Sequence, residues 1–471
     1  MSKIKSLVLG SAAAIVAIGG AQAADLPVKA KAVEYVKVCS LYGAGFYYIP
    51  GTDTCIRIGG YLRAEVNFNS APTDNTYLNG DGGLNLRTAG EYQSRARIMM
   101  NIDTRTATEY GVVRTFAAFG PQFTTGATNA GTDTQGNGGM RVEAAFVQFA
   151  GFTFGRSASA YALPWNGAPG NINAALLGGP NYDAGVNNIQ YTWQFGNGVS
   201  ASVGIDQQEQ ANRIGVLQGV PTVFGAYTNH YAAPTAPDVV GNIRLDQAWG
   251  LLQFSAAAHQ VTGDYYTGTA TAGHPSDKWG FAVTGGLQLK NLPTGPGDDI
   301  KISATYSEGA LRYVLGNSGA TPTNFQVLNG GFTFAGVPIA DGVYGVTGTS
   351  IELTKAYGFN GAFNHNWNRN WSSSVFGSWS RVDYNGAATA TICAGAYGGS
   401  VTCNPDFNIS QLGASTTWKP VKDLAFIAEA TWVHIDQKNV GTTTLTGLAG
   451  RTATFGNTDS YSGVLRVQRN F

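Results

Sequence analysis

The chain has 471 residues, and its 29 lysines and arginines are balanced by 29 aspartates and glutamates. This neutrality argues against a nucleic-acid partner, because nucleic-acid binding favours a clear basic excess. Charged residues make up only 12% of the chain, whereas soluble domains carry about 25%. The chain is also rich in glycine (64) and in aromatic residues (23 Phe, 22 Tyr and 9 Trp), so it is a poor match to an ordinary soluble protein.

The first 23 residues have the pattern of a removable export signal. Lys3 and Lys5 precede an uncharged, mostly apolar run over residues 7–18, and Ala-Gln-Ala stands just before Ala24. This run is shorter than the ~20 residues that a spanning helix needs. We therefore expect cleavage after residue 23 and a single mature domain over residues 24–471. That domain contains no run of 18 apolar residues, so it would span a membrane only as a β-barrel.

The four cysteines fall as two close pairs, Cys39 with Cys55 and Cys393 with Cys403. An exported chain meets an oxidising environment that favours disulfides. Three connectivities are possible, and we expect the local one because nothing else would bring residues 39 and 393 together; four free thiols are the alternative. The first bridge would close the N-terminal segment, residues 24–54, and stabilise it by roughly 3 kcal/mol.

Strict alternation of apolar and polar residues predicts strands over residues 56–68 and 95–103. Thirteen residues of period two suit a tilted membrane strand, whose charged side chains must face the lumen. A polar connection over residues 104–108 then leads to a strand over residues 110–119. The charged side chains on the polar faces of these strands are Arg57, Arg63, Glu65, Arg95, Arg97, Asp103 and Arg114.

Further strands are predicted along the rest of the chain. They cover residues 142–154, 186–195, 199–205, 241–245, 251–261, 279–292, 300–307, 357–367, 371–382, 409–418, 424–435 and 461–471. This makes about fifteen strands, with weak patterning over residues 206–240 and 309–354, so the even count of about 16 typical of bacterial barrels is favoured. Eighteen strands would also fit the length.

The connections between these strands fall into two length classes. The connections at residues 246–250, 368–370 and 419–423 are tight turns, whereas those at 309–326, 385–405 and 437–459 are long and rich in Gly, Ala, Thr and Asn. Short turns on one rim and long loops on the other are typical of outer-membrane barrels.

The last strand ends on an aromatic residue, Phe471. Val467 and Leu465 share its face of the strand, whereas Arg466 lies on the polar face. Exported chains that end this way are usually outer-membrane barrels, so we interpret Phe471 as a membrane-insertion signal. Arg469 also lies on the apolar face, where it could snorkel to the headgroups or pair across a subunit interface.

Three segments resemble sequence blocks of alphaproteobacterial porins. They are Glu34-Tyr-Val-Lys-Val-Cys39 with Tyr42-Gly-Ala-Gly-Phe46 and Tyr48-Ile-Pro-Gly-Thr-Asp-Thr-Cys55-Ile-Arg-Ile-Gly-Gly-Tyr61, then Ala145-Phe-Val-Gln-Phe-Ala-Gly-Phe-Thr-Phe-Gly-Arg156, and finally Gln468-Arg-Asn-Phe471. They lie at the start, middle and end of the mature chain. The resemblance implies a 16-stranded, homotrimeric porin of the Gram-negative outer membrane, a passive pore for small hydrophilic solutes.

The resemblance also implies a constriction loop. In such porins the loop after the second block folds into the barrel and narrows it, which here corresponds to residues 157–187, including Trp165. Many porins place several acids on this loop, whereas this chain has the single charge Asp183. The alternative is an external loop with no special role.

The arginines carry the most direct functional interpretation. The predicted channel-lining residues are Arg57, Arg63, Glu65, Arg95, Arg97, Asp103, Arg114 and Arg156. Because they come from neighbouring strands, they should form a patch that raises the local anion concentration and gives a mild anion preference. The alternative is that the arginines pair with carboxylates and merely line a wide polar pore.

Other functions find less support in the sequence. The five histidines lack metal-ligand spacing, and no Gly-x-Ser-x-Gly elbow occurs, so we expect no catalytic, metal or cofactor site. A substrate-selective channel remains an alternative, as does a barrel that acts in adhesion or enzymology through its long loops. The expected partners of a porin are outer-membrane lipid, small hydrophilic solutes and further copies of the chain.

Overall fold

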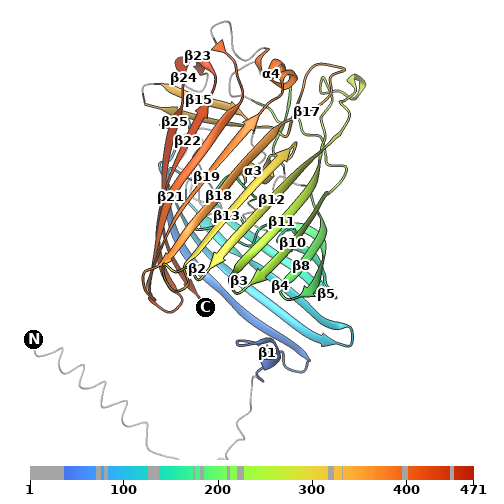
Figure 1. The fold of residues 1–471 in the computed structure, drawn as a ribbon, viewed down its shortest axis with the longest axis vertical. Coiled ribbons are helices and arrows are strands. Elements are labelled where there is room, and N and C mark those ends of the chain that lie inside the picture. Colours follow the sequence, from blue (N-terminus) through green and yellow to red (C-terminus); the bar gives the residue numbers. More distant parts are fainter. Residues whose placement is uncertain are drawn as a thin grey trace, which may run out of the picture.

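The structure is a computed structural model that describes residues 37–70, 76–78, 83–87, 89–125, 137–172, 176–180, 185–208, 213–219, 227–316, 323–330, 332–394, 401–445 and 450–471. The expected export signal, residues 1–23, lies outside the described residues, and so does Asp183. Within the described residues, sixteen antiparallel strands close into one barrel, because the last strand pairs with the first (Figure 1). This confirms the predicted all-β transmembrane barrel.

The barrel strands follow one another around the wall in chain order. The first eight are β2 (Thr54–Phe68), β3 (Tyr92–Thr108), β4 (Gly111–Thr124), β5 (Asn137–Phe149), β6 (Phe152–Ser157), β7 (Val186–Gly196), β8 (Val199–Asp206) and β10 (Asp238–Gln247). The other eight are β11 (Gly250–Val261), β12 (Lys278–Lys290), β13 (Asp299–Glu308), β18 (Lys355–Asn366), β19 (Trp371–Asp383), β21 (Phe407–Val421), β22 (Leu424–Gln437) and β25 (Thr458–Asn470).

The connections form two distinct rims. One rim, here called the turn rim, has the short links such as β10–β11, β18–β19 and β21–β22, at the positions where tight turns are predicted. The opposite rim, the loop rim, has the long links that follow β6, β8, β13, β19 and β22. In Figure 1 the turn rim is at the bottom and the loop rim at the top.

The sixteenth strand comes from a hairpin where one strand was predicted. The expected strand over residues 142–154 is wrong, because β5 ends at Phe149 and β6 begins at Phe152, directly opposite it. Ala150 and Gly151 form the turn with positive φ angles of 48° and 88°, which is the backbone of a two-residue hairpin turn. Because apolar residues flank this turn on both sides, the sequence pattern resembles that of one continuous strand.

The long loops form small sheets of their own at the loop rim. One sheet has the order β14-β15-β24-β23-β20 and another has the order β17-β16-β9. Their strands are β9 (Val216–Gln218), β14 (Asn324–Asn329), β15 (Thr333–Pro338), β16 (Gly342–Tyr344), β17 (Glu352–Leu353), β20 (Val401–Thr402), β23 (Val440–Leu445) and β24 (Arg451–Phe455). Short helices are η1 (Ser40–Tyr42), η2 (Ala270–Ala272), α3 (Arg312–Leu315) and α4 (Gly386–Cys393). None of the helices in the described part of the chain is long and apolar enough to cross a membrane.

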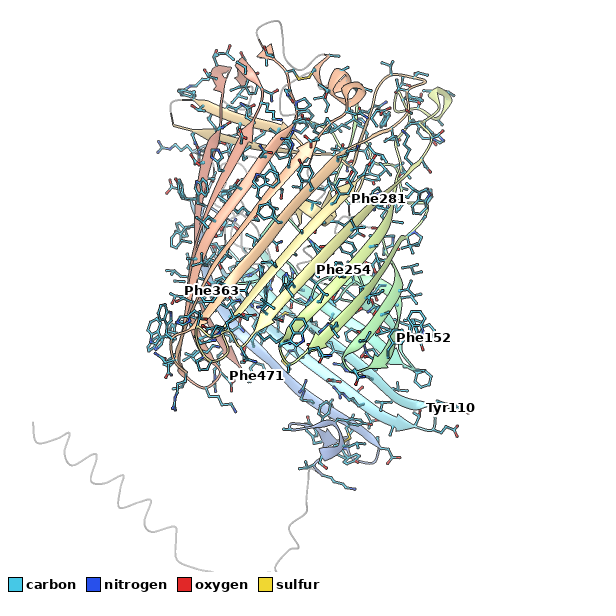
Figure 2. The ribbon with its side chains drawn as sticks, in the orientation of Figure 1. Tyr110, Phe152, Phe254, Phe281, Phe363 and Phe471 are labelled. Carbon is cyan, nitrogen blue, oxygen red and sulfur yellow. A yellow bond between two sulfur atoms is a disulfide. The ribbon has the colours of Figure 1, made fainter. Side chains whose placement is uncertain are left out.

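The barrel wall has an apolar outer face and a polar inner face. On β2 the outward side chains of Ile58 and Leu62 are 47% and 54% exposed. On the inner face of the same strand, Glu65 is buried. Phe254 and Phe281 project from the outside of the wall in the same way (Figure 2). This confirms the predicted alternation, and it matches a wall with lipid outside.

Both disulfides form within the local pairs, as predicted. Cys39 bonds to Cys55 and Cys393 to Cys403, with Cα–Cα distances of 6.0 and 5.7 Å. The first bridge holds the N-terminal segment against β2, where β1 (Tyr47–Tyr48) pairs with residues 55–56. The rest of β2, from Tyr61 onward, pairs with β25.

Replacing Cys39 and Cys55 with serine is expected to loosen the N-terminal segment without opening the barrel. The bridge closes a chain separation of 16 residues, and losing it should cost roughly 3 kcal/mol of local stability. Limited proteolysis of the detergent-solubilised barrel should then cut this segment faster. The matched control replaces Cys393 and Cys403 at the loop rim, which should leave that cleavage rate unchanged.

Candidate channel and constriction

Eight arginines lie on the inner face of adjacent strands, β2 to β5 and β25, and form what we call the arginine wall. They are Arg57, Arg63, Arg95, Arg97, Arg105, Arg114, Arg141 and Arg466. Five of them were predicted to line the channel. Because these strands are neighbours in the barrel, the side chains gather on one side of the lumen.

Three carboxylates are shared among seven of these arginines. Asp103 lies 3.9, 3.1 and 3.0 Å from Arg57, Arg105 and Arg114. Glu143 lies 3.0 Å from Arg97 and 3.3 Å from Arg141.

The third carboxylate, Glu65, bridges Arg95 and Arg466, the latter at 2.6 Å. The eighth arginine, Arg63, donates from Nε to Gln468 Oε1 at 2.9 Å. The arginines therefore do pair with carboxylates, as the alternative interpretation holds, but in the described part of the chain these seven arginines share only three carboxylates in ion pairs, so the positive groups outnumber the negative ones.

The arginine wall has a buried part and an accessible part. The side chains of Arg95 and Arg97 are only 2% and 1% exposed, so their charges are covered and hold the wall together. Arg57 is 49% exposed, and Arg105 and Arg114 are each 28% exposed. The accessible arginines therefore lie nearer the turn rim than the buried Arg95 and Arg97.

Arg156 does not belong to this wall, which corrects the prediction that it lines the channel. It pairs with Ala145 and lies on the same face of β6 as Phe152 and Phe154, and Phe152 projects from the outside of the barrel (Figure 2). Its Nε donates to the carbonyl of Val142 at 3.1 Å. The two-residue turn between β5 and β6 changes which parity faces outward, and the prediction did not include that turn.

Four charged residues of the site were missed from the sequence. The sequence pattern predicts a connection at Arg105, but β3 continues to Thr108, and Arg141 and Glu143 fall at the start of β5, before or at the edge of the predicted strand. The pattern puts Arg466 on the polar face and indicates no role for it. Extending each alternating pattern by three residues would have found the first three.

The loop after β6 enters the barrel, as the family resemblance implies. Its described residues 158–172 and 176–180 meet inner-face side chains of strands around much of the lumen. Trp165 packs with Leu163 of the same loop and Leu251 of β11. Lys301 and Asn364 donate to the carbonyl of Pro169 at 3.1 and 3.0 Å.

The far end of this constriction loop reaches the arginine wall. Arg466 donates to the carbonyl of Ile172 at 2.9 Å, and the Ile172 N–H donates to Glu429 Oε2 at 2.6 Å. Farther along the loop, the Leu177 N–H donates to Gln411 of β21 at 2.7 Å, and Asn360 of β18 donates to the Leu177 carbonyl at 3.1 Å. The loop is thus fixed to strands on several sides, which makes it a rigid partition of the lumen.

Comparisons with known proteins agree with this geometry. Residues 25–464 match the family model described as the Porin subfamily. Porin Omp2b of Brucella abortus is 34% identical over 317 residues, covering 61% of this chain and 81% of that protein, and its counterpart in Brucella melitensis is 33% identical. Among solved structures, the outer membrane channel DcaP of Acinetobacter baumannii has the same fold, with a TM-score of 0.60 and 17% identity over 90% of this chain and 99% of that one.

The family, the closed barrel and the inward loop point to one conclusion. A match over nearly the whole mature chain, joined to a polar lumen inside an apolar wall, describes a channel of the Gram-negative outer membrane. The chain belongs to the porin family, as a member of the Porin subfamily.

Proposed function

We propose that this porin is a passive pore for small hydrophilic solutes and ions, with a mild preference for anions set by the arginine wall. The observation that carries the proposal is the sharing of three carboxylates among seven arginines, which leaves the wall positively charged. In a channel with low-dielectric walls, a surplus of one sign raises the local concentration of the opposite ion.

The accessible arginines near the turn rim contribute most of this preference. In outer-membrane barrels the short turns face the periplasm, so Arg57, Arg105 and Arg114 lie toward the periplasmic mouth. Asp103, which they surround, is itself only 2% exposed. Among these four side chains the exposed charged groups are therefore guanidinium groups.

Replacing both Arg105 and Arg114 with glutamine is expected to shift the reversal potential in a salt gradient toward cation preference. The double variant removes two cations and leaves Asp103 with a single distant partner, Arg57 at 3.9 Å. Planar-bilayer recording of the purified porin measures the shift. The matched control is Arg381→Gln, which has similar exposure, pairs one-to-one with Asp383, and shares no carboxylate with the arginine wall.

An unchanged reversal potential in the double variant would contradict the assignment of selectivity to these side chains. An equal shift in Arg381→Gln would contradict it too, because the effect would then follow total charge.

Large ohmic steps that do not saturate with one solute are the expected conductance of a general diffusion pore.

We also propose that the porin assembles as a homotrimer, as the family resemblance implies. The outer face from β4 through β3, β2, β25, β22 and β21 to β19 supports this proposal, because it has an apolar groove in which small residues lie between aromatic ones. The groove is lined by Ala64, Ala96, Phe123, Trp371, Trp418, Phe426 and Leu465. Crosslinking in native outer membranes, read as the mass of the largest species, tests the assembly.

A further inference from the structure

A second segment enters the barrel beside the constriction loop. After β13 the chain turns inward, and α3 is buried among inner-face residues of the barrel. The ring of Tyr313 packs on that of Tyr161 in the constriction loop, with centroids 4.4 Å apart. The Gly178 N–H of the constriction loop donates to the carbonyl of Val314 at 2.7 Å. The two inward segments are therefore joined at two places.

This second segment is buried against an apolar part of the inner wall. The inner face of an outer-membrane pore is normally polar, yet near the loop rim of β19, β21 and β22 it is apolar and buried. These wall residues are Val382, Phe407, Ile409, Val433 and Ile435. They form one core cluster with Leu311, Val314, Phe325, Val327, Phe334 and Val337. The inward segment therefore packs directly on this part of the inner wall, where a water-filled lumen would require polar side chains.

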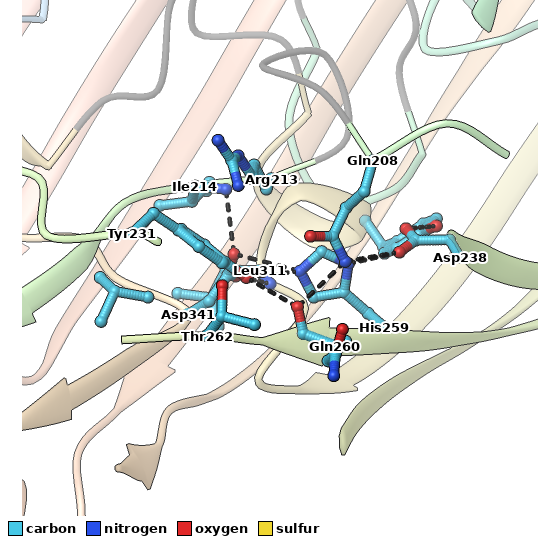
Figure 3. Close-up of polar contacts among 12 residues, drawn as sticks. Gln208, Arg213, Ile214, Tyr231, Asp238, His259, Gln260, Thr262, Leu311 and Asp341 are labelled. Atoms are coloured by element: carbon cyan, nitrogen blue, oxygen red, sulfur yellow. Dashed lines mark hydrogen bonds and ion pairs between the residues drawn. The ribbon is translucent and has the colours of Figure 1, made fainter. Parts of the chain in front are cut away.

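A buried polar cluster fixes this segment to the barrel, and we call Tyr231, Asp238, His259 and Asp341 the latch (Figure 3). His259 of β11 lies with Nδ1 2.8 Å from Asp238 Oδ1 and Nε2 2.8 Å from the Tyr231 hydroxyl. Asp341 Oδ2 lies 3.6 Å from the same Nε2. The side chains of His259, Asp238 and Asp341 have no exposed surface.

The latch holds both ends of the inward segment. Asp341 accepts hydrogen bonds from the N–H groups of Leu311, at 2.7 Å, and Ile214, at 3.0 Å. The Tyr313 hydroxyl donates to Asp238 Oδ2 at 2.7 Å. Burial, with the nearby Asp341 and Asp238 carboxylates, raises the pKa of Tyr231 well above its ordinary value, so this hydroxyl stays protonated as a donor. Buried networks of this kind are costly to break.

We propose that the described residues 309–316, 323–330 and 332–345 form a second constriction element, which together with the constriction loop excludes solutes from the lumen along β11 to β22 and confines permeation to the arginine wall. The inference rests on the proposed pore function and specifies the path that solutes take through the lumen. Inner-face side chains such as Ser307 and Ser380 are fully buried under the two inward segments. On the other side of the lumen, Arg57 and Arg114 are accessible near the turn rim, whereas Arg95 and Arg97 farther from that rim are buried.

Single cysteines placed on the two sides of the lumen test the route. The four native cysteines are all in disulfides, so an introduced thiol is the reactive one. Gln148→Cys lies on the arginine wall, where Gln148 accepts from Arg114 at 2.9 Å, and Ser307→Cys lies on β13 under the second constriction element. A charged thiol reagent added during bilayer recording should reduce the current through Gln148→Cys and leave Ser307→Cys unmodified.

Removing the second constriction element should open the protected side. Strands β13 and β18 remain paired up to Glu308 and Lys355, and the Gly309 N–H donates to the carbonyl of Thr354 at 2.8 Å. Residues 310–353 can therefore be replaced by a short Asn-Gly turn that keeps the hairpin. We expect a larger single-channel conductance, a weaker anion preference and loss of the protection of Ser307→Cys. Asp341→Ala, which releases Leu311 and Ile214, should move all three readouts in the same direction.

The matched control shortens a different long loop. Residues 267–272 form the mostly exposed tip of the loop between β11 and β12, and the Tyr266 N–H donates to the carbonyl of Gly273 across this tip at 3.0 Å. Replacement of this tip by the same turn should leave conductance and thiol protection unchanged. Equal reactivity of Ser307→Cys and Gln148→Cys in the otherwise native porin would overturn the inference, as would unchanged conductance after removal of residues 310–353. A native porin that forms no channels at all would overturn the pore function itself.

Discussion

Replacing Glu65 with glutamine is expected to destabilise the folded barrel by about 3–5 kcal/mol, the cost of breaking a buried ion pair. The Glu65 carboxylate lies between Arg95 and Arg466, and all three side chains are buried. The amide would remove the carboxylate that the two buried guanidinium groups of Arg95 and Arg466 share. Arg466 also holds the constriction loop through the carbonyl of Ile172, so that contact should weaken too. The midpoint of urea unfolding in detergent measures the loss.

Glu143→Gln is the matched control for this prediction. Glu143 also serves two arginines, Arg97 and Arg141, but its side chain is 28% exposed and water can solvate the groups that it leaves. We expect a clearly smaller shift of the unfolding midpoint. Equal losses in the two variants would show that burial of the Glu65 cluster is not what stabilises the barrel.

Replacing Gly60 with alanine is expected to cost more than about 2 kcal/mol of stability and to weaken barrel closure. Gly60 has a φ of +156°, and an added Cβ would overlap the backbone carbonyl of Met99 on the paired strand β3. That carbonyl cannot move without disturbing the strand pairing. The same glycine exchanges backbone hydrogen bonds with Phe471, both at 3.0 Å, so the disturbance reaches the closing strand.

The fraction of barrel that resists heat in an SDS gel measures closure in this variant. Gly139→Ala is the control, because a Cβ at Gly139 meets no atom within 4 Å although the residue also lies in a barrel strand. A Gly60→Ala barrel as heat-resistant as the control would refute the steric argument.

The barrel could be predicted from the sequence because lipid imposes a simple rule on each strand. Side chains on β2 and β3 alternate between an apolar outside and a polar inside, and the pattern survives without any knowledge of neighbouring strands. The pairing of Cys39 with Cys55 could be predicted for a similar reason, since it depends on a short stretch of chain. Local rules of this kind also placed Arg57 and Asp103 on one face.

What could not be predicted depends on contacts between distant segments. The hairpin at Ala150 and Gly151 has apolar residues on both sides, so only its backbone conformation distinguishes it from a continuous strand. The second constriction element has no period of its own. A signal for it exists on β21, where Phe407 and Ile409 share the inner face with the polar Gln411, but that signal has meaning only once the inner face is known.

The seam between β2 and β25 sets an order of events for assembly. Most strands pair with the next strand in the chain, whereas Glu65 and Arg466 meet across 401 positions. Closing so long a loop has the largest entropic cost and the slowest approach of any pairing in the wall. Until β25 arrives, the backbone groups of β2 from Tyr61 onward have no partner on that side, which lipid does not tolerate. Hairpins such as β21–β22 can therefore form early, but insertion of the finished wall must wait for its last strand.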